Sequence, residues 1–129
     1  MNYKTILVVD DDSDYLFQLC FYLQKEGYKV VSAGSEKEAL QILEKEKPDL
    51  AILDLMMENE DSGFRLSYRL KRKYPEVPVI IATAVASETG INFGLNGDED
   101  RGWIKADMYL EKGLRPDQML FAVQKLLYK

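Results

Sequence analysis

The chain has no histidine and only one cysteine, Cys20, among its 129 residues. The lack of histidine excludes serine–histidine and cysteine–histidine triads as well as histidine-ligated zinc sites. A single cysteine excludes a disulfide within the chain. No apolar run approaches the length of a membrane span, and the N-terminal residues lack the apolar core and cleavage site of a signal peptide. We therefore expect a cytoplasmic protein without membrane insertion.

The chain also has fewer basic than acidic residues. Lysine and arginine number 17 against 22 acidic residues, which gives a formal net charge of −5. No basic stripe is available for a phosphate backbone, so we expect no nucleic-acid partner. The chain is 47% hydrophobic and 30% charged, which is typical of a domain that folds around a core. We expect one domain over residues 1–129, with no linker and no room for an attached output domain.

Short apolar runs alternate with amphipathic stretches along the chain. Most runs are continuous, as is typical of strands buried on both faces of a parallel sheet. They are Ile6–Val9, Tyr28–Ala33, Leu50–Leu53, Val77–Thr83 and Met108–Leu110. Helical patterns lie between and after these runs, so the order predicts a doubly wound α/β sheet with right-handed crossovers. Ligands of such sheets bind beyond the carboxyl ends of the strands.

Local signals mark the expected helix ends. Ser13 is a candidate N-cap of the first helix, and Gly27 is placed to stop it. Ser35 and Glu38 fit a capping box at the start of the second helix. The segment from Val85 to Lys105 is rich in glycine, and we expect a long loop with a short or distorted fourth helix there.

Polar residues stand where the predicted strands end. They are Asp10 and Asp11 for the first strand, Asp54 for the third, Thr83 for the fourth and Lys112 for the fifth. Because parallel strands end at the same edge, three carboxylates, a hydroxyl and an ammonium are expected to share a cleft. Carboxylate oxygens suit octahedral Mg²⁺, which would offset the repulsion among the aspartates. Asp54 is then a candidate nucleophile for a phosphoryl group.

Each of these residues also has a plainer interpretation. Asp12 and Asp14 are better explained as a helix cap and a first-turn charge than as metal ligands. Taken alone, Lys112 could be a solvated surface lysine, and Thr83 could reflect strand propensity. Cys20 is best explained as a core residue on a helix face.

Four segments carry a resemblance to the receiver domain of two-component response regulators. They are "ILVVDDD", "KPDLAILDLMM", "VPVIIATA" and "YLEK", in this order and over essentially the whole chain. The resemblance, to a stand-alone single-domain type, implies a flavodoxin-like (βα)5 three-layer sandwich with parallel strand order 2-1-3-4-5. It implies that Asp54 is the phosphoacceptor and that Asp10 and Asp11 form the acidic pair, with Asp11 the more direct metal ligand. The carbonyl of Met56 would complete the metal site.

The resemblance also implies a function. A histidine kinase or a histidine phosphotransfer protein would phosphorylate Asp54 with Mg²⁺ or Mn²⁺, and the output would be altered binding to a downstream protein target. Thr83 and Lys112 would hold the phosphoryl group. Tyr109 would be an aromatic switch residue, although it could also be a plain core aromatic. The domain would be a monomer or a phosphorylation-dependent homodimer, and it would catalyse only its own phosphorylation and dephosphorylation.

Other functions stay open at this point. The main alternative is a constitutive docking module with a receiver fold that phosphorylation does not control. A small metal-dependent phosphatase usually needs a second acidic residue where Met56 stands, which argues against that function. A flavin protein needs a phosphate loop rich in serine, threonine and glycine after the first strand, and the sequence has none there. The chain also departs from the family pattern, because Gly113 replaces a usual proline and Thr83 and Tyr109 stand 26 positions apart.

Overall fold

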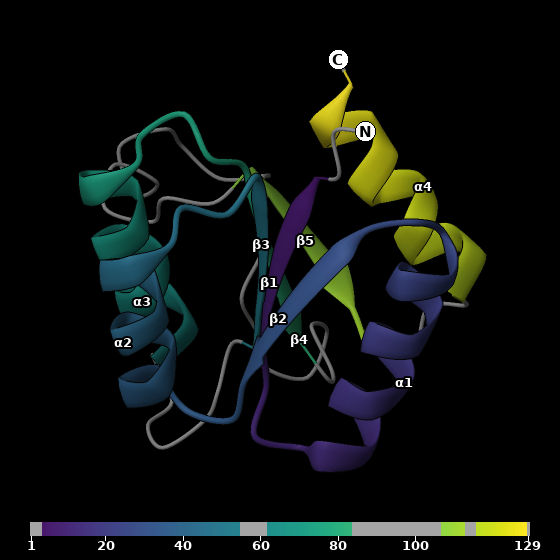
Figure 1. Ribbon diagram of the computed structural model, residues 1–129, viewed down its shortest axis with the longest axis horizontal. Helices are drawn as coiled ribbons and strands as arrows, with labels where there is room; N and C mark the ends of the chain where they lie inside the picture. Colours follow the sequence, from purple (N-terminus) through teal and green to yellow (C-terminus); the bar gives the residue numbers. More distant parts are fainter. Residues whose placement is uncertain (1–3, 55–61, 84–106, 113–115, 129) are drawn as a thin grey trace.

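A computed structural model describes residues 4–54, 62–83, 107–112 and 116–128 of the chain. It is a three-layer sandwich in which a five-stranded sheet has α2 and α3 on one face and α1 and α4 on the other (Figure 1). The strands are β1 (Thr5–Val9), β2 (Lys29–Ala33), β3 (Leu50–Asp54), β4 (Val79–Thr83) and β5 (Met108–Glu111). The helices are α1 (Ser13–Lys25), α2 (Glu36–Lys45), α3 (Ser62–Lys73) and α4 (Pro116–Leu127).

The strand order is β2-β1-β3-β4-β5, and all four strand pairs are parallel. This confirms the predicted fold. Two strands begin later than the apolar runs suggest. The amide of Tyr28 donates to the carbonyl of Leu23, and the amide of Val77 donates to the carbonyl of Tyr74. Tyr28 and Val77 therefore belong to the turns that follow helices. The fourth helix expected between residues 85 and 105 lies outside the described residues.

The core has two halves, one on each face of the sheet. In β1, Ile6 and Val8 pack toward α1 and α4, whereas Leu7 and Val9 pack toward α2 and α3. The central strands β3 and β4 alternate in the same way, which explains why their sequences are continuous apolar runs. Cys20 is partly buried against the core half under α1 and α4, as expected of a helix-face residue. Among the described helices, none has the length and apolar character needed to span a bilayer.

The first helix begins differently from the prediction. Its N-cap is Asp12 and not Ser13, because Asp12 Oδ1 accepts the amides of Asp14 at 3.1 Å and Tyr15 at 3.3 Å. Ser13 is instead the first helical residue. The interpretation of Asp12 as a cap and Asp14 as a first-turn charge is confirmed. Gly27 follows the helix end with φ +96°, a conformation that favours glycine.

The second helix is capped as predicted, with one difference. Ser35 Oγ accepts the amide of Glu38 at 3.1 Å. Glu38 reaches back in return, but its Oε1 accepts the amide of Gly34 at 2.8 Å, one residue before the cap. The reciprocal pair therefore satisfies two backbone donors and fixes the turn between β2 and α2.

Candidate functional site

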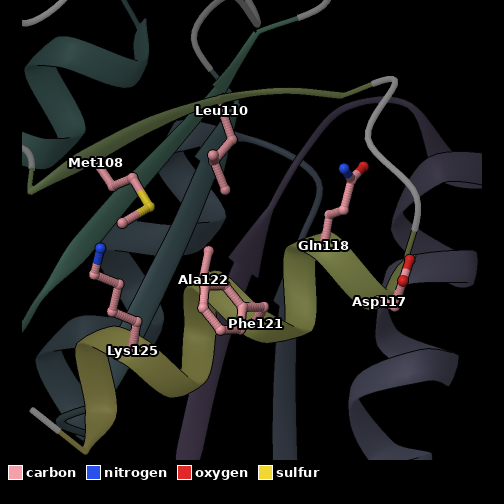
Figure 2. Close-up of a pocket in the computed structure, with 7 residues that line it drawn as sticks. All are labelled: Met108, Leu110, Asp117, Gln118, Phe121, Ala122 and Lys125. Carbon is pink, nitrogen blue, oxygen red and sulfur yellow. The ribbon is translucent and has the colours of Figure 1, made fainter.

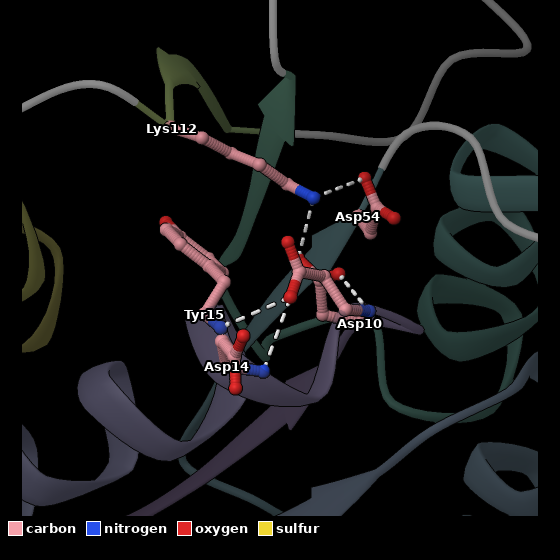
Figure 3. Close-up of polar contacts among 6 residues, drawn as sticks. Asp10, Asp14, Tyr15, Asp54 and Lys112 are labelled. Carbon is pink, nitrogen blue, oxygen red and sulfur yellow. Dashed lines mark hydrogen bonds and ion pairs between the residues drawn. The ribbon is translucent and has the colours of Figure 1, made fainter.

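The carboxyl ends of three parallel strands bring the predicted polar residues together. Asp10 follows β1, Asp54 is the last residue of β3, and Lys112 follows β5. The strands β1 and β3 are neighbours, whereas β4 stands between β3 and β5. Figure 3 shows the Lys112 side chain extending across this edge to both aspartates. The structure thus brings these three residues together at one edge of the sheet, as the sequence predicts.

Lys112 forms two ion pairs at the site. Its Nζ lies 2.7 Å from Asp10 Oδ2 and 3.1 Å from Asp54 Oδ1. Asp10 is 2% exposed and Asp54 is 5% exposed, so both carboxylates are almost entirely removed from water. A buried charge is costly unless it is paired. One ammonium facing two buried carboxylates leaves an excess of negative charge at the site.

A third carboxylate lies close to the buried pair. Oxygens of Asp10, Asp11 and Asp54 are all within 4.8 Å of one another, and Asp11 is exposed. A hard divalent cation such as Mg²⁺ binds a few carboxylates and keeps several waters. The donor set fits this preference because all three ligands are oxygens and the Asp11 side faces solvent. Asp10, Asp11 and Asp54 could therefore hold Mg²⁺.

The charges at the site shift the pKa values of its groups. Burial, and then the charge of Asp10, raises the pKa of Asp54 to about 6, against the opposing effect of Lys112. Burial alone would lower the pKa of Lys112, but its bonds to Asp10 and Asp54 outweigh burial, and its pKa is raised. Lys112 is thus firmly held as an ammonium, while the Asp54 carboxylate carries the unfavourable excess charge.

The loop that carries the acidic pair is held by its own side chains. Asp10 Oδ1 accepts the amide of Asp12 at 2.8 Å, while Asp10 Oδ2 faces Lys112. Asp12 in turn caps α1, so its carboxylate is turned toward the helix start. Asp10 therefore contributes to both the loop structure and the ionic cluster.

The sequence analysis missed one residue at the site, Tyr15. Lys112 Nζ lies 5.1 Å from the centroid of the Tyr15 ring, and the two side chains lie side by side in Figure 3. Burial, and then the charge of Asp10, raises the pKa of Tyr15 to about 12. A signal was present in the sequence, because Tyr15 stands four residues before Leu19 and eight before Leu23, both buried. That spacing places all three on the helix face that packs on the sheet.

The other predicted residues are described in part or not at all. Thr83 ends β4 in register with Glu111, the neighbour of Lys112, and Tyr109 pairs with Ile81 within the sheet. The backbones of Thr83 and Tyr109 therefore have the expected positions, but their side chains lie outside what the structure describes. Met56 and Gly113 fall outside the described residues altogether.

A separate groove lies between β5 and α4, away from the acidic cluster. Its volume is about 550 Å³, and Figure 2 shows side chains from both elements facing it. The lining is mainly apolar and includes Met108, Leu110 and Ala122, with Lys125 at one end. Phe121 borders the groove and is 68% exposed. An apolar groove with an exposed aromatic side chain is a feature of protein-binding surfaces.

Comparisons with known proteins agree with this geometry. The family model of the response regulator receiver domain matches residues 6–124. The alkaline phosphatase synthesis transcriptional regulatory protein PhoP of Bacillus subtilis is 33% identical over 96% of the chain. The heme response regulator HssR of Staphylococcus aureus is 34% identical over 94% of the chain. The match covers 48% of PhoP and 50% of HssR, so the chain corresponds to about half of each relative.

Solved structures show the same similarity. A CheY-like response regulator receiver domain protein from Methanospirillum hungatei superposes with a TM-score of 0.82 at 28% identity, covering 98% of this chain and 94% of that one. The response regulator TrrA of Thermotoga maritima, solved in complex with Mg²⁺-BeF, superposes with a TM-score of 0.79 at 31% identity, covering 96% of this chain and 99% of TrrA.

Proposed function

Because the chain belongs to the response regulator receiver domain family, we propose that it is a signalling switch controlled by phosphorylation of Asp54. The observation that carries the proposal is the buried cluster in which Lys112 pairs with both Asp10 and Asp54, with Asp11 beside them. A domain that served only as a docking surface has no evident need for this costly set of charges.

The chemistry would be transfer of a phosphoryl group from a phosphohistidine of a kinase or phosphotransfer protein. An Asp54 oxygen attacks phosphorus, the phosphorus–nitrogen bond breaks, and the histidine leaves with the bonding pair and takes up a proton. The pKa of Asp54, at about 6, leaves most of this carboxylate ionised at neutral pH and thus able to attack. Lys112 would offset the charge that moves onto the site.

Mg²⁺, or Mn²⁺ in its place, would neutralise the charge of the phosphoryl oxygens when bound. Asp10, Asp11 and Asp54 would hold it, and the family pattern adds the carbonyl of Met56. The TrrA structure was solved with Mg²⁺-BeF, which supports a cation at the equivalent place here. Thr83 would bind a phosphoryl oxygen from the end of β4, beside the strand that carries Lys112.

The output would be altered binding to a downstream protein, with Thr83 and Tyr109 as the switch residues. The groove between β5 and α4 supports this, because Tyr109 belongs to β5 and the groove offers an apolar surface. The domain would act in the cytoplasm, as a monomer or as a homodimer formed on phosphorylation. It would catalyse no reaction apart from its own phosphorylation and dephosphorylation.

Phosphorylation by a small donor tests the proposal directly. The protein is incubated with acetyl phosphate and Mg²⁺, and intact mass is measured, with a chelator in place of Mg²⁺ as the control. We expect a gain of one phosphoryl group that the chelator prevents. A protein that stays unmodified with Mg²⁺ present would favour the alternative of a constitutive docking module.

A further inference from the structure

The contact between Tyr15 and Lys112 has a role that the family assignment does not supply. We propose that Tyr15 is a positioning residue, whose ring holds the Lys112 ammonium over the carboxylates of the site. The effect on phosphorylation rests on the proposed function, whereas the placement of Lys112 does not.

The geometry is that of a cation above an aromatic face. Lys112 Nζ is 5.1 Å from the centroid of the Tyr15 ring, within the range of about 6 Å for this interaction. The ammonium thus has three attractive neighbours, which are two carboxylates and one ring. The ring belongs to α1, and Lys112 follows β5, so the contact joins two elements at the sheet edge (Figure 3).

The Tyr15 ring contributes most to the position of Lys112 when Asp10 and Asp54 bind a metal ion. A divalent cation at Asp10 and Asp54 would share their oxygens and repel the ammonium. Phosphorylation would change Asp54 in addition. The ring attracts the ammonium through its quadrupole, independently of what the carboxylates bind. Its hydroxyl stays protonated across the physiological range, since the pKa of Tyr15 is about 12.

Within the described part of the chain, the Tyr15 ring restrains Lys112 in addition to the two carboxylates. The next residue in the sequence is Gly113, the type with the greatest backbone freedom, where the family usually has proline. Tyr15, by contrast, is well fixed. Its amide bonds to Asp12 Oδ1 at 3.3 Å, its side chain packs against the core half under α1 and α4, and Asp12 is bonded to Asp10. The loop that carries the acidic pair therefore also sets the position of the ring.

The contact can be tested without metal or phosphate. A ring face shields the protons above it, so the ε-methylene protons of Lys112 should resonate upfield of those of other lysines. The signal is assigned by its loss in Lys112→Met, in protein labelled at lysine and kept free of metal. We expect the upfield shift in the wild type and in Tyr15→Phe, and its loss in Tyr15→Leu. Amide spectra of all variants check that the fold is retained.

The consequence for chemistry is measured as the rate of phosphorylation by acetyl phosphate at saturating Mg²⁺. Tyr15→Leu should be slower by about three- to fivefold, the scale of a single exposed cation–π contact. Tyr15→Phe should restore the rate, because it keeps the ring and removes only the hydroxyl. The Kd for Mg²⁺ should stay within about twofold in both variants, because neither changes a carboxylate.

Two outcomes would overturn the proposal. One is an upfield Lys112 signal that persists in Tyr15→Leu. The other is a lost signal with an unchanged rate, which would make the contact irrelevant to positioning. A wild type that takes up no phosphoryl group would instead refute the proposed function, and the Lys112 signal would still decide whether the ring places the ammonium.

Discussion

The two edges of the sheet use the same residue types in opposite ways. At the amino edge, Asp49 precedes β3 and Asp107 precedes β5, and each stands next to the first residue of a neighbouring strand. At the carboxyl edge, Asp10 and Asp54 both pair with Lys112, and Asp11 lies beside them. In the first arrangement each aspartate has hydrogen-bond donors of its own, whereas in the second two buried carboxylates share one ammonium and a third carboxylate lies close to them.

The amino edge shows how an aspartate stabilises a strand end. Asp49 Oδ2 accepts the amide of Thr5, and the Thr5 carbonyl accepts the amide of Asp49, both at 2.7 Å. Asp107 forms the same pair with Val79, at 2.8 Å in each direction. Lys71 adds an ion pair to Asp107 at 2.8 Å. These bonds satisfy backbone groups that the sheet leaves unpaired, so this edge contributes stability.

The carboxyl edge has the opposite energetics. Asp10 and Asp54 are buried, and the charge of the carboxylates exceeds that of Lys112. Burial, and then the charge of Asp10, raises the pKa of Asp54. Such an edge lowers the stability of the metal-free domain and gains from any added positive charge. The aspartates of the amino edge therefore have a structural role, whereas those of the carboxyl edge form the proposed functional site.

The largest expected effect is on phosphorylation. Asp54→Asn should abolish labelling by acetyl phosphate, because an amide oxygen cannot form the acyl phosphate. Asp49→Asn, at the other edge, should be labelled like the wild type. Intact mass of both variants with Mg²⁺ measures this. Undiminished labelling of Asp54→Asn, or loss of it in Asp49→Asn, would mean that the two edges have been assigned wrongly.

A lysine at each edge provides the next comparison. Lys112→Met should lower the free energy of unfolding by about 2 to 3 kcal/mol without metal, because it leaves two buried carboxylates unpaired. Lys71→Met should cost about 1 kcal/mol or less, since Asp107 is 34% exposed and keeps its bonds to Val79.

Urea unfolding gives the free energy of unfolding of both lysine variants and of the wild type. When the measurement is repeated with Mg²⁺, Lys112→Met should lose less free energy of unfolding than it does without metal. The loss for Lys71→Met should be unchanged. Equal losses for the two variants would show that the carboxyl edge is no more dependent on its cation than the amino edge.

The stability of the carboxyl edge should depend on pH through Asp54. The pKa of Asp54 is raised from 3.8 to about 6 on folding, so its favourable contribution is complete below pH 3.8 and is lost as the pH rises through 6. Asp54→Asn should therefore be more stable than the wild type by about 1 to 2 kcal/mol at pH 8 without metal. The difference in free energy of unfolding between Asp54→Asn and the wild type should disappear toward pH 4.

The control for the pH series is Asp49→Asn, which should gain no stability at pH 8, because its carboxylate is already matched by the amide of Thr5. Free energies of unfolding are measured at several pH values with a chelator present. A constant difference between Asp54→Asn and the wild type would contradict the raised pKa.

The smallest expected effect is stabilisation by metal. Mg²⁺ at tenfold excess over its Kd should stabilise the wild type by about 1.4 kcal/mol through mass action. Asp11→Ala should lose most of this gain, whereas Asp14→Ala should keep it, because Asp14 belongs to the first turn of α1 and not to the cluster. Melting temperatures with and without Mg²⁺ compare the variants. An intact response in Asp11→Ala would remove this residue from the metal site.

Much of the fold was predictable because the sequence repeats one simple pattern. Continuous apolar runs between amphipathic stretches specify parallel strands covered on both faces, and the structure has such strands. Their order in the sheet was implied by the family resemblance and not by the apolar pattern. The convergence of Asp10, Asp54 and Lys112 followed from the same rule, since parallel strands must end together. Residue type and position along a strand were sufficient for these conclusions.

The remaining features depended on details that a sequence does not rank. Asp12 and Ser13 are adjacent and both suit an N-cap, and only the reach of the carboxylate to the next amides selects Asp12. The contact of Tyr15 with Lys112 joins distant parts of the chain and depends on the direction of two side chains. The roles of Thr83, Tyr109 and Met56 rest on the family pattern and stay predictions.

The hydrogen bonds of the loop after β1 connect backbone amides to the carboxylates of the site. Asp10 Oδ1 accepts the amide of Asp12, and Asp12 Oδ1 accepts those of Asp14 and Tyr15. Amide protons held in this way exchange slowly with deuterated solvent and faster once the acceptor is withdrawn. A cation that competes for Asp10 would first change the exchange rate of the Asp12 amide, and then the rates of the Asp14 and Tyr15 amides. Isotope exchange at three backbone positions would therefore report the occupancy of the cluster without any label on its side chains.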